Sequence, residues 1–182
     1  MNMNMCNAVI IFLGVVLLWS IHATADERSF GPVIEGYGPT YPINDRDVPL
    51  REDFVYNAVF DSAANPDVTG LNTGLVSVAR FLNMHARNGV SVDNMNIAVV
   101  VHGPALKALL TDDSYFSRHG MDNPNTELVQ KLHAAGVRFY VCGQSVMFGG
   151  FEKEELVGPA KVALSAMTMM TELQSDGYAL LR

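Results

Sequence analysis

Three side chains that can act as nucleophile, base or acid stand at the ends of apolar segments that resemble buried strands. They are Asp61 after Phe54–Phe60, His102 after Met95–Val101, and Cys142 at the end of Val137–Cys142. In open α/β sheets, ligands bind outside the carboxyl ends of parallel strands. If these three strands are neighbours, the three side chains line one rim of the sheet and share one site.

Cys142 is the candidate nucleophile. Gly143 follows it directly and permits close approach of the backbone, and Gln144 and Ser145 come next. A turn into a helix at this point would aim amide N–H groups at the sulfur, which lowers a thiol pKa and favours the reactive thiolate. The alternative is a small apolar residue of the core. No second cysteine lies nearby, which excludes disulfide exchange of the CxxC type.

His102 is a candidate assistant to Cys142, as a general base or hydrogen-bond donor. The competing interpretation is a partly buried ring that caps a backbone group, and Asp61 then only ends its strand with a turn. His85, His119 and His133 have no metal-ligand spacing among them, so we expect no metal site.

Motifs of other chemistries are missing. No GxGxxG follows the first strand, and neither GxxxxGK[ST] nor GxSxG occurs, so nucleotide-binding and hydrolase functions lack their phosphate cradle or nucleophile elbow. Met167, Met169 and Met170 indicate core or a subunit interface rather than a copper site, because adjacent helix positions point apart. We expect no cofactor.

The first 25 residues read as a signal peptide. Residues 8–21 are apolar apart from Gly14 and Ser20, and Ala23-Thr24-Ala25 forms a small-x-small cleavage site. This run of about 14 residues is shorter than the ~20 that a membrane-spanning helix needs. We therefore predict a periplasmic or secreted protein without a membrane segment after cleavage. The alternative is an uncleaved anchor, since no Lys or Arg precedes the run.

Composition narrows the partners of the mature chain. The formal net charge is −7 and the basic residues form no run, so nucleic acid and anionic membranes are poor partners. Cleavage would remove Cys6 and leave Cys142 as the only thiol, which excludes an intrachain disulfide. A length of 182 residues suits one domain with a sizeable core.

Strand and helix patterns alternate after a proline-rich extended leader at residues 26–53, and they predict one α/β domain over residues 54–182. Further strands are expected at Val162–Leu164 and Tyr178–Leu181. Helices are expected at Asn72–Asn88, Ala105–Leu110, Pro124–Ala135 and Thr168–Ser175, with a helical turn at Glu152–Leu156, a polar loop at Thr111–Asn123 and an irregular Gly-rich segment at Gln144–Phe151. The order predicts a three-layer α/β/α fold with a mostly parallel sheet of about five strands.

The segments Ile97–Leu110, Asn123–Ser145 and Val162–Leu181 closely resemble the DsrE/DsrF-like (YchN-like) family, and the likeness begins near Phe54. The resemblance implies a parallel sheet between helices and assembly as a trimer or hexamer. It also implies a cysteine that accepts sulfur as a persulfide, and Cys142 is the residue to which that role is carried over. The characterised relays are cytoplasmic, whereas this chain carries a predicted export signal.

Two functions follow as hypotheses. The first is a periplasmic sulfur-handling protein, a possible sulfurtransferase, in which Cys142 carries sulfur as a persulfide, His102 assists, and a sulfur donor or acceptor protein is the partner. The second is a non-catalytic oligomeric binding or scaffold protein in which Cys142 is structural.

Overall fold

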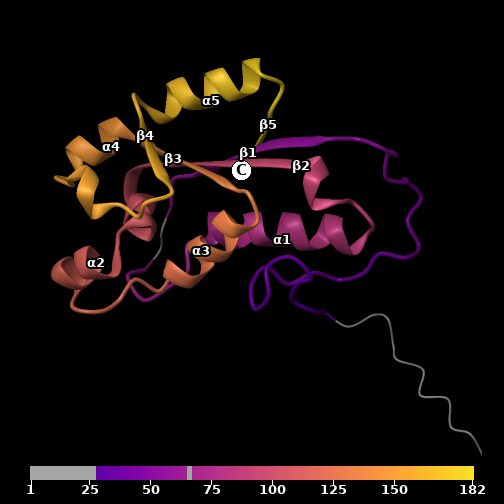
Figure 1. Ribbon diagram of the computed structural model, residues 1–182, viewed down its shortest axis with the longest axis horizontal. Helices are drawn as coiled ribbons and strands as arrows, with labels where there is room; N and C mark the ends of the chain where they lie inside the picture. Colours follow the sequence, from indigo (N-terminus) through magenta and orange to yellow (C-terminus); the bar gives the residue numbers. More distant parts are fainter. Residues whose placement is uncertain (1–27, 65–66) are drawn as a thin grey trace, which may run out of the picture.

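The computed structural model describes residues 28–64 and 67–182 (Figure 1). The predicted signal peptide at residues 1–25 lies outside the described residues. The sheet has five strands, all parallel, in the order β4-β3-β2-β1-β5. The strands are β1 (Tyr56–Ser62), β2 (Met95–Val101), β3 (Arg138–Cys142), β4 (Ala160–Ala163) and β5 (Ala179–Leu181). The predicted α/β class and parallel sheet are confirmed.

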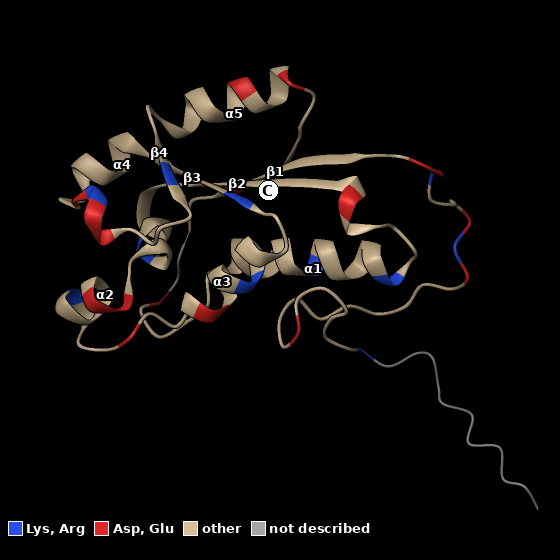
Figure 2. Ribbon diagram, in the orientation of Figure 1, with Lys and Arg blue, Asp and Glu red and all other residues tan. Residues whose placement is uncertain are grey.

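Helices lie on both sides of this sheet, α1 and α3 on one face and α5 on the other (Figure 1). The α-helices are α1 (Thr73–Arg87), α2 (Asp112–His119), α3 (Thr126–Ala134), α4 (Gly143–Phe148) and α5 (Ala166–Ser175), and the 3-10 helices are η1 (Val92–Asn94), η2 (Gly103–Leu109) and η3 (Lys153–Glu155). None of the helices in the described part of the chain is long and apolar enough to cross a membrane. Charged residues of both signs are scattered along the helices and the leader (Figure 2).

The two faces of the sheet bury cores of different size. The larger core joins α1, η2 and α3 to the sheet and contains large side chains such as Leu75, Leu82, Leu132 and Phe139. The smaller core lies under α5 and consists of Val59, Ala98, Val100, Cys142, Ala166 and Leu173. Because β2 is covered on both faces, its sequence is apolar almost throughout, as expected for a central parallel strand.

Two segments expected to be irregular are helical. Helix α2 occupies the predicted polar loop at 111–123: the Thr111 hydroxyl accepts from the Ser114 N–H at 3.2 Å, and Gly120 ends the helix with a φ of 74°. This helix buries only Tyr115, so it shows no apolar periodicity. Helix α4 begins at Gly143, one residue before the predicted Gly-rich irregular segment, and occupies residues 144–148 of that segment.

Among the boundaries that differ from the prediction, two bear on the site. The helix expected at 105–110 is the 3-10 helix η2, which begins earlier, at Gly103. Strand β1 runs to Ser62, two residues further than expected, so Asp61 lies within the strand and does not form a turn after it. A polar residue can remain in the strand here because this end of β1 reaches the rim of the sheet.

A buried side chain of α1, that of Asn83, holds the leader, and Arg87 of the same helix donates to the Gly31 carbonyl group at 3.1 Å. Oδ1 of Asn83 accepts from the N–H groups of Val33 and Ile34 at 3.0 and 2.8 Å. Its Nδ2 donates to the carbonyl groups of Ile34, Tyr37 and Gly38 at 3.1, 2.9 and 3.2 Å. Since Ile34 is itself part of the larger core, the leader contributes to the folded domain.

Replacing Asn83 by Ala is expected to release the leader. The substitution leaves buried backbone groups without partners, so the free energy of unfolding should fall by about 1–3 kcal/mol or more. Chemical denaturation measures the loss, and hydrogen exchange should show lost protection at Ile34. Asn96→Ala is the matched control, because Asn96 is exposed and its side-chain amide donates to Oδ1 of Asn57. Equal stability of the two variants would contradict this account of the leader.

Candidate functional site

The sheet brings Asp61, His102 and Cys142 to one face of one rim. Asp61 pairs with Val100, which in turn pairs with Tyr140. Successive side chains of a strand alternate between faces. His102 and Cys142 stand two positions after Val100 and Tyr140, so all three candidates point toward the α5 side at the carboxyl ends of adjacent strands. The condition on which the predicted shared site depended, that the three strands are neighbours, is therefore met.

His102 is held by Asp61. Its Nε2 lies 2.7 Å from Oδ1 of Asp61, and Nε of Arg182 lies 3.9 Å from the other carboxylate oxygen. The carboxylate accepts from the ring nitrogen and fixes the orientation of the imidazole. With the proton on Nε2, Nδ1 of His102 is left as an acceptor. Of the two interpretations of His102, the structure shows a ring bound to a side chain and not one that caps the backbone.

Cys142 is the N-cap residue of α4 and ends β3. The residue is buried, with 6% of its surface exposed, and packs in the smaller core below α5. Burial alone suits a structural cysteine, so the polar surroundings of the sulfur distinguish the two hypotheses.

The sulfur lies among four hydrogen-bond donors. Burial raises the pKa of the Cys142 thiol, but the hydroxyl of Ser145 and the N–H groups of Ser145, Ala166 and Gln144 outweigh it, so the net pKa is lowered. The Cys142 side chain makes no capping hydrogen bond with α4. The donating N–H groups belong to the first turns of α4 and α5, whose dipoles add to the effect.

Ser145 connects the thiol to the turn after β2. Its Oγ accepts from the Gly103 N–H at 2.9 Å, and its hydroxyl also contacts the Cys142 sulfur. Sequence reasoning assigned no role to this hydroxyl. The role could have been predicted from the spacing, because Ser145 stands three residues after the N-cap residue Cys142. At this spacing a side chain can reach back to the N-cap residue.

Gly143 lets β4 approach the start of α4. A Cβ at this position would lie 2.6 Å from the Ala163 carbonyl oxygen and 3.3 Å from that of Leu164. The chain then turns at Ser165, whose hydroxyl accepts from the Thr168 N–H at 3.0 Å and caps α5. The close approach therefore carries the first N–H of α5, that of Ala166, to the sulfur.

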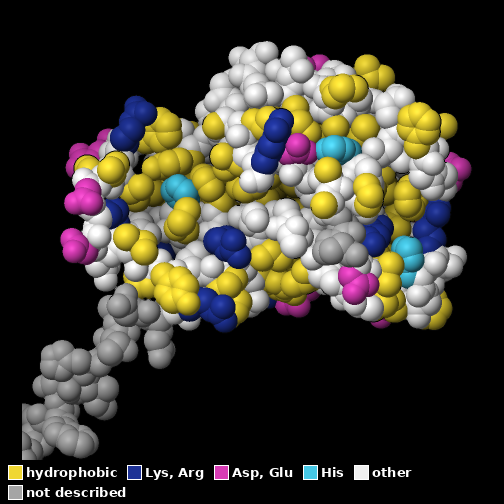
Figure 3. Space-filling model, turned by 180° about the vertical axis from the view of Figure 1, so that it is seen from behind, with side chains coloured by type: hydrophobic (Ala, Val, Ile, Leu, Met, Phe, Trp, Pro, Cys, Tyr) yellow, Lys and Arg dark blue, Asp and Glu magenta, His cyan; other side chains and the backbone are white. Residues whose placement is uncertain are grey.

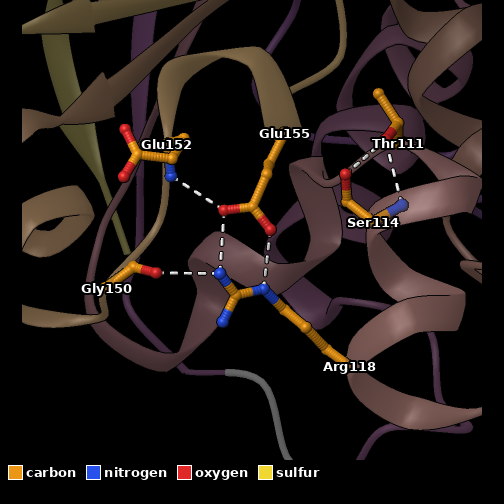
Figure 4. Close-up of polar contacts among 6 residues, drawn as sticks. All are labelled: Thr111, Ser114, Arg118, Gly150, Glu152 and Glu155. Atoms are coloured by element: carbon orange, nitrogen blue, oxygen red, sulfur yellow. Dashed lines mark hydrogen bonds and ion pairs between the residues drawn. The ribbon is translucent and has the colours of Figure 1, made fainter.

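A cavity of about 500 Å³ opens beside the rim, between η2 and α4. Ser145 lines it, together with Phe148 and Phe151. The far wall is fixed by Arg118, whose Nε and Nη2 donate to the two carboxylate oxygens of Glu155 at 2.8 Å each, as Figure 4 shows. The same guanidinium stacks on the Phe151 ring at 4.3 Å.

Figure 4 also shows how the segment before η3 is held. Nη2 of Arg118 donates to the Gly150 carbonyl at 2.8 Å, and Glu155 accepts from the Glu152 N–H at 2.7 Å. The two parallel bonds from Arg118 to the Glu155 carboxylate fix the relative orientation of the two side chains. In the described ranges, no group of three or more His, Cys, Asp or Glu side chains is placed to hold a metal ion.

Removing the Ser145 hydroxyl should make the Cys142 thiol less acidic. Loss of a donor that favours the thiolate raises the thiol pKa, so Ser145→Ala should slow alkylation at pH values below that pKa and move the midpoint of the pH–rate profile upward. Iodoacetamide kinetics between pH 5 and 10 measure the shift. Ser175→Ala, on the exposed surface of α5, should leave the profile unchanged. An unmoved or lower midpoint in Ser145→Ala contradicts the assignment.

A methyl group at Gly143 should push β4 and α4 apart. Overpacking of this kind costs about 1–3 kcal/mol, and Gly143→Ala should also remove the Ala166 N–H from the sulfur and raise the thiol pKa. Thermal unfolding and the alkylation profile test both effects. Gly158→Ala serves as control, because a Cβ there meets nothing within 4 Å. If the two variants behave alike, close approach at Gly143 is not required.

Comparison with known proteins agrees with this fold. A structure of a protein of unknown function, MTH1491 from Methanobacterium thermoautotrophicum, superposes with a TM-score of 0.52 at 21% sequence identity, covering 70% of this chain and 98% of that one. This likeness shows the fold alone. No curated protein matches the sequence. Residues 62–182 match the DsrE/DsrF-like family, and the chain belongs to that family.

Proposed function

We propose that this protein is an exported sulfur carrier in which Cys142 accepts one sulfur atom as a persulfide and passes it to a partner thiol. Membership of the DsrE/DsrF-like family favours a function of the sulfur-relay type. The observation that carries the proposal is the set of donors from Gln144, Ser145 and Ala166 around one sulfur, which lowers its pKa despite burial.

The hydrogen-bond donors around the sulfur favour both steps of the transfer, loading and delivery, because both involve the Cys142 thiolate. In loading, the Cys142 thiolate attacks the sulfane sulfur of a donor. A bond forms between the two sulfurs, and the bond from the sulfane sulfur to the donor breaks, with its electron pair leaving on the donor. The cysteine sulfur is oxidised and the donor is reduced. In delivery, an acceptor thiolate attacks the outer sulfur and Cys142 leaves as a thiolate, which a low pKa accelerates.

His102 assists by moving the acceptor's proton. With its Nε2 proton donated to Asp61, His102 offers Nδ1 as a base to a thiol arriving at the rim. The described part of the chain holds no second cysteine, so no residue within 28–64 and 67–182 can displace the stored sulfur by forming a disulfide with Cys142.

The proposal includes export and assembly. The predicted signal peptide at residues 1–25 would direct the chain to the periplasm or outside the cell. Hydrophobic side chains are exposed over much of the face in Figure 3. Leu164 and Met167 are among the exposed apolar residues, and a homotrimer or homohexamer would cover such surface.

The alternative function, an oligomeric scaffold with a structural Cys142, is supported by the burial of the residue in the core below α5. The two functions differ in one property. A carrier must expose its sulfur to a small donor without unfolding, whereas a scaffold need not.

Incubation of the folded protein with polysulfide should add one sulfur atom to Cys142. Intact-mass spectrometry detects the adduct, and a reductant should reverse it. Cys142→Ser should remain folded and take up no sulfur, because the donors that surround the sulfur can also bond to the serine oxygen. His102→Gln should load normally but deliver sulfur to a small thiol more slowly. A native thiol that takes up no sulfur, and that is alkylated only in denaturant, would favour the scaffold function.

A further inference from the structure

We propose that the cavity between η2 and α4 binds the apolar half of a small anionic sulfur donor, and that organic thiosulfonates, R–SO₂–S⁻, are the substrate class of Cys142. This inference rests on the proposed function. It names a small molecule as the sulfur donor in the loading step. The delivery step, in which sulfur passes from Cys142 to a partner thiol, is unchanged.

The cavity has the size and lining of a small-molecule site. Its volume of about 500 Å³ lies within the range of ligand pockets. Phe148 and Phe151 supply aromatic walls, Pro104 adds apolar surface, and Lys107 contributes the cation. An open apolar hollow with one positive charge suits a ligand that joins a hydrocarbon or aromatic group to an anion.

Ser145 places this cavity next to the nucleophile. The residue lines the cavity, and its hydroxyl contacts the Cys142 sulfur. A ligand whose R group lies against the aromatic walls would therefore have its anionic end near the Ser145 hydroxyl, which lies between the cavity and the Cys142 thiolate. The wall itself is rigid, because Phe151 stacks on Arg118 and that guanidinium is fixed by Glu155.

A thiosulfonate meets these requirements and gives a balanced step. The Cys142 thiolate attacks the terminal sulfane sulfur, the bond between that sulfur and the sulfonyl sulfur breaks, and its electron pair leaves on the sulfinate, R–SO₂⁻. Cys142 is oxidised to the persulfide anion and the sulfonyl sulfur is reduced to the sulfinate level. Two negative charges enter and two leave, and neither a proton nor another oxidant is required.

Rates of sulfur loading from two thiosulfonates test whether the cavity binds the apolar group of the donor. The wild-type protein should load sulfur from benzenethiosulfonate faster than from methanethiosulfonate, which has the same reacting atoms without the ring. Phe148→Ala should reduce this preference about tenfold. Phe148 is 91% exposed, so the variant should fold. Met147→Ala is the matched control: Met147 neighbours it on α4, is 77% exposed and lies outside the cavity wall.

Binding of the product tests the cavity without the reaction. Benzenesulfinate should bind to Cys142→Ser in calorimetry, bind more weakly when Phe148→Ala is added, and bind more tightly than methyl phenyl sulfone, which has the ring but no charge. If both donors load sulfur at equal rates and benzenesulfinate does not bind, the inference is overturned while the carrier function stands. If no donor loads sulfur but benzenesulfinate binds as described, the carrier function fails and the cavity assignment stands.

Discussion

The parallel pairing of β3 with β2 on one side and β4 on the other is the constraint on which the site depends. Parallel strands end at the same edge of a sheet, and each must be followed by a connection that begins there. The pairing therefore places the residue after β2, the end of β3 and the helix start after β4 within one small region. Cys142 occupies the middle of that region, and its neighbours arrive from three separate connections.

Two opposing electrostatic effects meet at this cysteine. Removing a thiol from water favours its neutral form, whereas amide and hydroxyl donors favour the anion. The donors prevail here: the hydroxyl and N–H of Ser145 and the N–H of Gln144 belong to α4, and the N–H of Ala166 belongs to the start of α5. The geometry that achieves this depends on the absence of a side chain at Gly143, where strand β4 comes into close contact. Packing of the fold and acidity of the thiol are therefore coupled at one glycine.

The sequence predicted what is encoded locally. Strand β2 was located to the residue because Met95–Val101 is a dense apolar run. Helix α1 was located because apolar residues recur along it at helical spacing and Gly89 follows its end. The three rim residues followed from where the strands end. Helix α2 was missed because a short polar helix that buries one side chain has no apolar period.

The remainder of the site depends on contacts between distant parts of the chain. The N–H of Ala166 reaches the sulfur only because β4 lies beside β3, and no local pattern gives strand order. Asp61 was assigned to a turn because aspartate is disfavoured in strands, and its bond to His102 crosses between two strands. The cavity is likewise formed by segments that meet only in the folded chain.

The attachment of the leader has a consequence for where the chain could be shortened. Asn83 bonds to Val33 and Ile34, 50 and 49 positions earlier in the chain, and Ile34 lies in the larger core. A chain that began at the first strand would therefore lose a core side chain and leave the buried amide of Asn83 without these partners. The smallest stable form of the domain thus begins before β1, in a segment that belongs to neither the sheet nor its helices.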